Sequence, residues 1–401
     1  MNFGWIVRSF VYMGCLLLLT SCWNSRELNN LGIVSGMGVD KVPDKEEYQV
    51  TFQVVIPSST ATSAGASTGK PTITIYSAKD RTIFGAFRKT SKIAARQLFF
   101  AHTQLFVIGE STAKSGIEGI FDIFERSHEL RLNTEVIVAR DTDAISILKL
   151  LQPIENLPAV GIVKKSKNTA RIWGESRDIN VFELVNGMGG EGEVVISGAK
   201  IIGNPEDGAK KSGMEQTIVK ALVTMSGIGV FKNGILQGWL DDSVARGALW
   251  VQNEINETSI NVDSRDIKDS IAVNINQSKT KIKIELHDKQ AILHVDVVEE
   301  GGINEAQSYI DMSKKEEIEN LEVELAQETK REIIQALQAA QEMKCDIFNF
   351  ANELKRTNPK AWDLVKDDWE SVFAKAELDV SVKAYIRSIG MRLNPQLFKK
   401  K

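Results

Sequence analysis

The sequence has 401 residues, of which 43% are hydrophobic and 25% are charged. That length is enough for about two or three globular domains, and the composition is that of a folded protein rather than a disordered or multi-spanning one. The formal net charge of −4 argues against nucleic acid as a partner, because binding its phosphates needs a surplus of clustered Lys and Arg.

The first 21 residues have the layout of a secretory signal. One cation, Arg8, precedes an apolar run at positions 10–19. A membrane-spanning helix needs ~20 apolar residues, and this run is shorter and is followed by the polar sequence that begins after Cys22. We therefore expect residues 1–21 to be a cleaved signal peptide.

The residues Leu19-Thr20-Ser21-Cys22 resemble a bacterial lipobox, with Leu three positions before the cysteine and small residues between. The resemblance implies cleavage before Cys22 and attachment of lipid to its thiol. Each buried CH₂ contributes ~0.8 kcal/mol, so two or more acyl chains hold a protein firmly at a bilayer. Cys15 is the rival, but Tyr12 stands at its matching position. An ordinary cleavage site beside an unmodified Cys22 is the other alternative.

Residues 22–200 are predicted to form an N-terminal α/β domain, because strand and helix periods alternate along the segment. Strands are expected at 48–56, 72–76, 105–108 and 135–139, and helices at 80–98, 112–125 and 142–151. Residues 57–70 are almost wholly Ser, Thr, Ala and Gly, which predicts a mobile loop.

Residues 201–262 are predicted to form a middle domain that contains a hairpin. Asn233-Gly234 separates two apolar runs, and both residues tolerate the positive φ that a tight hairpin turn needs. A connection is expected before the hairpin, at 201–215, and a short helix after it, at 242–253.

Residues 263–398 are predicted to form a C-terminal α+β domain. Alternating strands are expected at 270–276, 281–286 and 291–298, with a closing strand at 378–386. Ser313-Lys314-Lys315-Glu316 matches a capping box and predicts a long helix that ends at Asn358-Pro359, with a kink near Asp346. The expected fold class is therefore α+β (mixed α/β): an N-terminal α/β domain, a hairpin-containing middle domain and a C-terminal antiparallel sheet with long helices.

The sequence contains no pattern that indicates catalysis, a cofactor or a metal. None of His102, His128, His287 and His294 belongs to a two-histidine zinc motif, and Cys345 is the one thiol of the body. The segment 187–192 matches Gly-x-Gly-x-x-Gly, but it follows an expected helix and precedes an expected strand. That order is the reverse of a dinucleotide site, so we interpret the segment as a flexible loop. The sequence therefore predicts a protein that is not an enzyme.

A charged cluster of Arg126, Glu129 and Arg131 follows the expected helix at 112–125. It is a candidate partner contact; the alternative is a local set of ion pairs at a helix end. Glu110, directly after the strand at 105–108, is interpreted as an acid at a helix start rather than a catalytic base.

Taken together, the chain resembles the Ger(x)C family, the lipoprotein C subunits of spore germinant receptors. The residues that carry the resemblance extend over nearly the whole chain, and their order and spacing are more specific than any one of them. They are Cys22-Trp23-Asn24-Ser25-Arg26-Glu27-Leu28, Gly36-Met37-Gly38-Val39-Asp40, His102, Ile108-Gly109-Glu110, Ala113, Gly116-Ile117, Arg126 with Glu129 and Arg131, Gly229-Val230-Phe231-Lys232, Leu236 with Gly238-Trp239-Leu240, and Gly247 with Leu249-Trp250. Two departures are Asn24, where the family more often has Asp, and Asn233-Gly234-Ile235, where it is usually more basic.

The resemblance implies a non-catalytic receptor subunit that assembles with two membrane-embedded subunits in the spore inner membrane, anchored on its outer face through Cys22. It also implies a three-domain mixed fold and a response to small nutrients. Two other functions stay open from the residues alone. A solute-binding lipoprotein of a transporter predicts a cleft between two similar α/β lobes. An envelope hydrolase needs a nucleophile or metal site, and the sequence shows neither.

Overall fold

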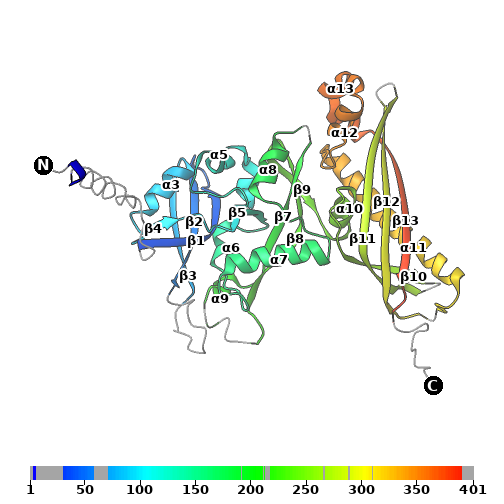
Figure 1. The fold of residues 1–401 in the computed structure, drawn as a ribbon, viewed down its shortest axis with the longest axis horizontal. Helices are drawn as coiled ribbons and strands as arrows, with labels where there is room; N and C mark the ends of the chain where they lie inside the picture. The colour runs from blue at the N-terminus through cyan, green and yellow to red at the C-terminus, as the bar shows by residue number, and fades with distance from the viewer. Residues whose placement is uncertain are drawn as a thin grey trace.

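The computed structural model describes residues 3–5, 30–57, 71–190, 192–210, 212, 217–264, 267–287, 290–308 and 310–390. Two sheets, each carrying helices, lie at opposite ends of an elongated molecule (Figure 1). We call residues 31–240 the N-lobe and residues 242–390 the C-lobe. The mixed α+β class predicted from the sequence is confirmed. The signal peptide, Cys22 and nearly all of the loop expected at 57–70 lie outside the described residues.

Within the described residues, nine strands form the mixed sheet of the N-lobe. Their order is β3-β2-β1-β5-β6-β7-β8-β9, and β4 pairs with β1. The central strands β1, β5, β6 and β7 are parallel, while the neighbours on both sides pair antiparallel. The strands are β1 (Leu31–Lys41), β2 (Tyr48–Val55), β3 (Ile73–Asp80), β4 (Gln97–Phe99), β5 (Leu105–Gly109), β6 (Glu135–Ala139), β7 (Val194–Gly203), β8 (Ala221–Lys232) and β9 (Ile235–Leu240).

Helices cover both faces of this sheet, because its central strands are apolar on both sides. Phe106 and Ile108 of β5 pack under α3, α5 and α8, whereas Leu105 and Val107 pack against α6 and α7. The helices of the lobe are α3 (Ile83–Thr90), α4 (Glu110–Ser115), α5 (Glu118–Arg126), α6 (Ala144–Lys149), α7 (Pro158–Ile172), α8 (Val181–Met188) and α9 (Pro205–Gly208).

One predicted helix of the N-lobe is divided in two. The periodicity over 112–125 predicts a single helix, but α4 ends at Ser115 and α5 begins at Glu118. Gly116 between them has a φ of 109°, which stops the helix and which L side chains rarely adopt. The position of the break therefore follows from one glycine.

The predicted hairpin is confirmed, and its two strands extend the N-lobe sheet. Asn233 and Gly234 have φ values of 48° and 69° at the turn between β8 and β9. Strand β7 crosses position 200, where the sequence places the end of the first domain. The boundaries at 200 and 262 stay a prediction.

The C-lobe sheet has the order β10-β11-β12-β13 within the described residues. Strands β10 to β12 pair antiparallel, but the strands predicted separately at 270–276 and 281–286 are one strand, β11, and β10 was not predicted. Strand β13 is parallel to β12, so the sheet is not wholly antiparallel. The reason is the helical crossover between β12 and β13, which returns the chain in the same direction. The strands are β10 (Thr258–Ser264), β11 (Ile267–His287), β12 (Gln290–Ala306) and β13 (Glu377–Ser388).

The long helix of the C-lobe is shorter than predicted. Its N-cap is Lys314 without a side-chain hydrogen bond, so the capping box is wrong; the Ser313 hydroxyl instead donates to Asp311 Oδ1 at 2.6 Å. The helix ends at Met343, and Lys344 adopts left-handed geometry. The chain thus turns close to the kink expected near Asp346. The helices are α10 (Asp242–Val251), α11 (Lys315–Met343), α12 (Phe350–Thr357), α13 (Pro359–Val365), the 3-10 helix Lys366–Asp368 and α14 (Trp369–Ala374).

The two lobes share one apolar core. Val195, Ile228 and Val230, from β7 and β8, belong to the same buried cluster as Trp250 of α10 and Leu337 of α11. The lobes are therefore joined by packing as well as by the chain. Within the part of the chain that the structure describes, no helix is both long and apolar enough to cross a bilayer.

Candidate functional site

The residues of the predicted charged cluster lie on the surface at and after the end of α5. The Arg126 guanidinium binds the Asp122 carboxylate one turn earlier, with Nε 2.8 Å from Oδ1, so its partner is not Glu129. The Glu129 amide donates to the Ser127 hydroxyl, and the Arg131 carbonyl accepts from the Thr134 hydroxyl. The turn is thus held by the backbone groups of Glu129 and Arg131, and these hydrogen bonds do not involve their side chains.

Arg126 and Glu129 border an open groove of about 670 Å³ between α3 and α5, and Arg131 does not. On the α3 side, the Arg88 guanidinium lies 4.7 Å from the centre of the Phe84 ring, and Phe84 is 51% exposed. An exposed aromatic ring among cations and carboxylates is a composition that suits a macromolecular partner better than catalysis.

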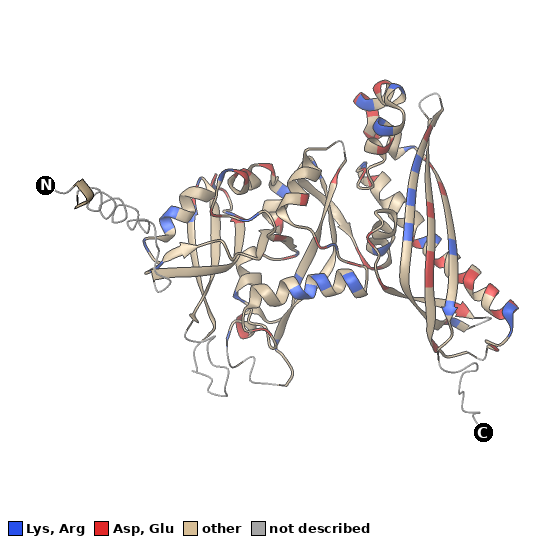
Figure 2. Ribbon diagram, in the orientation of Figure 1, with Lys and Arg blue, Asp and Glu red and all other residues tan. Residues whose placement is uncertain are grey.

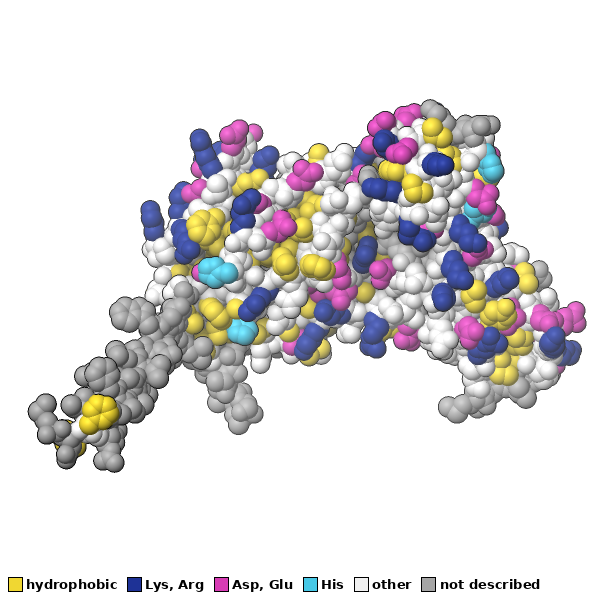
Figure 3. Space-filling view, turned by 45° about the horizontal axis from the view of Figure 1, so that its top comes forward, with side chains coloured by type: hydrophobic (Ala, Val, Ile, Leu, Met, Phe, Trp, Pro, Cys, Tyr) yellow, Lys and Arg dark blue, Asp and Glu magenta, His cyan; other side chains and the backbone are white. Residues whose placement is uncertain are grey.

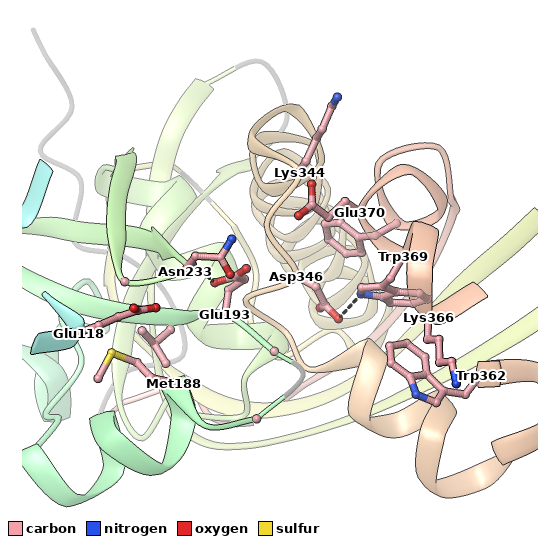
Figure 4. A pocket seen from close by; sticks show the side chains of 15 residues that line it. Glu118, Met188, Glu193, Asn233, Lys344, Asp346, Trp362, Lys366, Trp369 and Glu370 are labelled. Atoms are coloured by element: carbon pink, nitrogen blue, oxygen red, sulfur yellow. Dashed lines mark hydrogen bonds between the residues drawn. The ribbon is translucent and has the colours of Figure 1, made fainter. Parts of the chain in front are cut away.

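A second cavity, of about 260 Å³, lies where the two lobes meet (Figure 4). Asp346 points into it and is fully buried, and its carboxylate accepts N–H groups from Phe350, Ala351 and the Trp369 indole, the last at 3.2 Å. Burial raises the pKa of this carboxyl, and those hydrogen bonds lower it again in part. Further lining side chains shown in Figure 4 are Glu118, Met188, Glu193, Asn233, Lys344, Trp362, Lys366 and Glu370.

The charged groups of this cavity are largely engaged with the protein itself. The Glu193 carboxylate accepts the Asn233 amide at 3.1 Å, and Glu370 forms an ion pair with Lys232 at 2.5 Å. These contacts join the residue before β7 to the β8–β9 turn, and the end of β8 to α14. We therefore interpret the cavity as part of a polar contact between the two lobes.

The glycine motif at 187–192 has a packing explanation. It joins α8 to β7, in the helix-then-strand order that the sequence predicts. A Cβ atom on Gly192 would lie 2.1 Å from Asn349 Oδ1 of the C-lobe, far inside contact distance. Glycine here permits the close approach of the two lobes.

Several residues that carry the family resemblance meet at one edge of the N-lobe sheet. Glu110 begins α4, as predicted, and its carboxylate accepts from Lys114 Nζ at 2.8 Å and from the Trp239 indole at 3.4 Å. Arg140 stacks over Trp239 at 4.7 Å and pairs with Asp241. Burial alone would raise the pKa of Glu110, but the hydrogen bonds it accepts lower it. The carboxylate therefore stays ionised and joins α4 to β9.

A buried ion pair joins α10 to α11, and it was not predicted from the sequence. Arg246 and Glu332 are both buried, and their side chains meet through two hydrogen bonds, of 3.0 and 2.5 Å. Beside them the Thr329 hydroxyl donates to Glu299 of β12 at 2.9 Å. Arg246 and Glu332 stand 86 positions apart, so no local spacing could have found the pair.

His102 and His128 lie in the N-lobe, whereas His287 and His294 both lie beside Glu285 of β11, at 3.5 and 3.8 Å. His128 borders the groove at α5, His102 packs edge-on against Phe99, and His294 Nδ1 lies 2.8 Å from Asp379. Among the described residues, no three His, Cys, Asp or Glu side chains are grouped so that they could hold a metal ion. Cys345 is buried, and burial raises the pKa of its thiol to about 12.

Comparisons with known proteins agree with the resemblance seen in the sequence. Residues 24–201 match the model of the spore germination protein N-terminal domain, and residues 226–390 match that of the spore germination B3/GerAC-like C-terminal domain. The chain is 31% identical to spore germination protein KC of Bacillus subtilis (strain 168), over 95% of each chain. It is 23% identical to spore germination protein B3 of the same organism, over 94% of this chain and 96% of that relative.

A solved structure supports the fold. The crystal structure of the GerBC protein superposes with a TM-score of 0.55 at 17% identity, and the match covers 88% of this chain and 97% of that one. The two family models and the relative that is 31% identical over nearly the full length lead to one conclusion. The chain belongs to the Ger(x)C family of spore germination proteins.

Proposed function

We propose that this protein is a non-catalytic, lipid-anchored subunit of a spore nutrient germinant receptor. Acyl chains on Cys22 hold it on the outer face of the spore inner membrane, where it assembles with two membrane-embedded subunits. The observation that carries the proposal is the lipobox at Leu19–Cys22, ahead of a body whose relatives are named spore germination proteins.

The test of the anchor is Cys22→Ala in the full chain. Without the thiol, no acyl chain can be attached, so the protein should leave the membrane fraction and nutrient-triggered germination should fall strongly. Cys15→Ala is the matched control, since it removes a leader thiol outside the lipobox. Normal germination with Cys22→Ala protein released from the membrane would contradict the proposal. Mass spectrometry of the native protein reports lipidation directly.

We also propose that Arg126, Glu129 and Arg131 contact a partner subunit. Two of them border the groove between α3 and α5, and the Arg126–Asp122 pair lies on the surface, where solvent screens it. Reversing all three charges should therefore leave the urea midpoint unchanged while weakening co-purification of the partner subunits. The control is reversal of Lys281, Lys283 and Lys383 on the exposed face of the C-lobe sheet. Equal loss of co-purification in both variants would contradict the assignment.

The solute-binding alternative predicts a cleft between two similar lobes. The nine-stranded and four-stranded sheets of the described chain differ in size, order and helical cover. Calorimetric binding of a nutrient by the purified protein would favour this alternative over a subunit that acts through its partners.

A further inference from the structure

The segment from Lys79 to Arg96 stands out by its charge. The chain as a whole has a net charge of −4, yet this segment contains a single carboxylate, Asp80. Its cations are Lys79, Arg81, Arg88, Lys89, Lys92 and Arg96, and all six are exposed. We call these six residues, with Phe84 and Ile93, the basic patch. The patch occupies the end of β3, the helix α3 and the turn that leads to β4.

Most of the patch is available to a partner. Lys89 is bound to Asp80 at 2.6 Å, and Arg88 lies over the Phe84 ring. Within the described part of the chain, no carboxylate lies within 4 Å of the side-chain nitrogens of Arg81, Lys92 or Arg96. The apolar members are exposed as well, Phe84 by 51% and Ile93 by 55%. Cations around projecting apolar side chains make up a surface suited to the interface of an anionic bilayer.

The patch lies where the chain enters the folded body. Strand β1 pairs with β4 in parallel register, with Leu31 opposite Gln97, so the first strand starts beside Arg96. Figure 2 shows Lys and Arg on α3, at the end of the molecule opposite the C-lobe sheet, and Figure 3 shows cations gathered with hydrophobic side chains at this end. Cys22 precedes Leu31 by nine positions, a stretch that reaches at most about 30 Å. A lipid on Cys22 therefore brings this end of the molecule to the membrane.

We propose that the basic patch binds the headgroups of anionic phospholipids and so fixes the orientation of the anchored protein on the bilayer. The inference rests on the proposed anchoring through Cys22. Lys and Arg stems lie along the apolar boundary while their charged ends bind phosphate, and Phe84 and Ile93 enter the headgroup region. The carboxylates of the adjacent groove, Asp122 and Glu129, lie on the α5 side. The α5 side is thus left for a protein partner.

The experiment uses the full, lipidated chain in vesicles. Ser91→Cys places a polarity-sensitive fluorophore in the patch, because Ser91 is exposed, Cys22 is blocked by lipid and Cys345 is buried. Ser381→Cys, exposed on β13 of the C-lobe, is the matched label. Each protein is placed in phosphatidylcholine vesicles with and without one-third phosphatidylglycerol, and quenching by brominated lipid is measured.

We expect the Ser91 label to be quenched in the anionic vesicles and not in the neutral ones, and the Ser381 label in neither. Each Lys or Arg near an anionic surface contributes about fivefold in binding, so Arg81→Glu with Lys92→Glu and Arg96→Glu should abolish the difference. Salt at 1 M should do the same, since it shortens the Debye length to ~3 Å. The control triple of Lys281→Glu, Lys283→Glu and Lys383→Glu should keep it.

Equal quenching of the Ser91 label in both vesicles overturns the proposal. So does a result in which the patch reversal blocks co-purification of a membrane subunit but leaves the lipid response intact, because the patch then binds protein. The anchoring itself has a separate readout. A lipidated chain sediments with neutral vesicles whatever the patch does, whereas an unanchored chain with a working patch sediments with anionic vesicles alone.

Discussion

Two buried contacts, one in each lobe, hold helices in place in different ways. In the N-lobe, Asp40 at the end of β1 accepts the amides of Ala144 and Ile145 and so holds the start of α6. In the C-lobe, α10 and α11 are joined by a buried pair of side chains, Arg246 and Glu332. A carboxylate at a helix start is stabilised by backbone that the helix leaves unpaired. A buried ion pair has no such support, so each partner depends on the other.

The largest expected effect therefore comes from breaking the C-lobe pair. Arg246→Met leaves Glu332 buried without its cation and should lower the free energy of unfolding by about 4 kcal/mol, measured by urea denaturation. The double variant Arg246→Met with Glu332→Leu should recover most of that loss. Arg331→Met removes a neighbouring exposed arginine and serves as the control. A cost for Arg246→Met no larger than for Arg331→Met would contradict the comparison.

The next effect is a pH dependence located in the C-lobe. Burial raises the pKa of Glu299 to about 8, with Glu332 adding to the shift and Thr329 opposing it. The folded state therefore holds this proton more tightly than the unfolded chain. The stability that the protonated Glu299 contributes is fully present below pH 4.5 and is lost as pH rises toward 8. Between pH 5.5 and 7.5 the loss should be about 3 kcal/mol.

Glu299→Gln should flatten this dependence, because the amide keeps an oxygen for Thr329 and cannot ionise. Urea titrations at several pH values measure the slope. Glu300→Gln is the matched control, since the neighbouring side chain is partly exposed and hydrogen bonding by Arg387 lowers the pKa of its carboxyl. If the two variants gave the same slope, the C-lobe would not be the source of the pH dependence.

The smallest effect tests the tie in the N-lobe. A Cβ atom on Gly109 would lie 2.1 Å from Asp40 Oδ1, so Gly109→Ala must displace the carboxylate that holds α6. We expect a cost of about 2 kcal/mol by urea denaturation. Gly119→Ala is the control, because its Cβ atom meets nothing within 4 Å in helix α5, and it should be neutral or slightly stabilising. Equal urea midpoints for Gly109→Ala and Gly119→Ala would show that Asp40 can hold α6 from another position.

Local pattern predicted the elements well where one residue decides the backbone. Asn233-Gly234 located the hairpin, and the helix-start role of Glu110 followed from its place after a buried strand. The capping box predicted at Ser313 was wrong, because the Ser313 hydroxyl donates to Asp311, two residues earlier, and does not accept a helix amide. A short polar side chain often has several such partners, and sequence alone does not rank them.

Contacts between distant segments were beyond local reasoning. The direction of β13 depends on the path of five helical segments after β12, and the Arg246–Glu332 pair depends on how α10 meets α11. The groove itself was not predicted from the sequence. Arg126 and Glu129 were singled out, but Phe84 and Arg88 lie on α3, some forty positions earlier, and their approach to α5 requires the folded sheet.

The apolar core common to both lobes has a mechanical consequence. The two family models part between positions 201 and 226, a natural place to expect a hinge. Yet Val195, on one side of that division, and Ile228, on the other, belong to the same buried apolar cluster as Trp250. Bending there would expose this apolar core to water, so the two lobes resist bending relative to one another. A tilt imposed at the end nearest the proposed lipid anchor would then rotate the whole body, and the C-lobe at the far end would move with it.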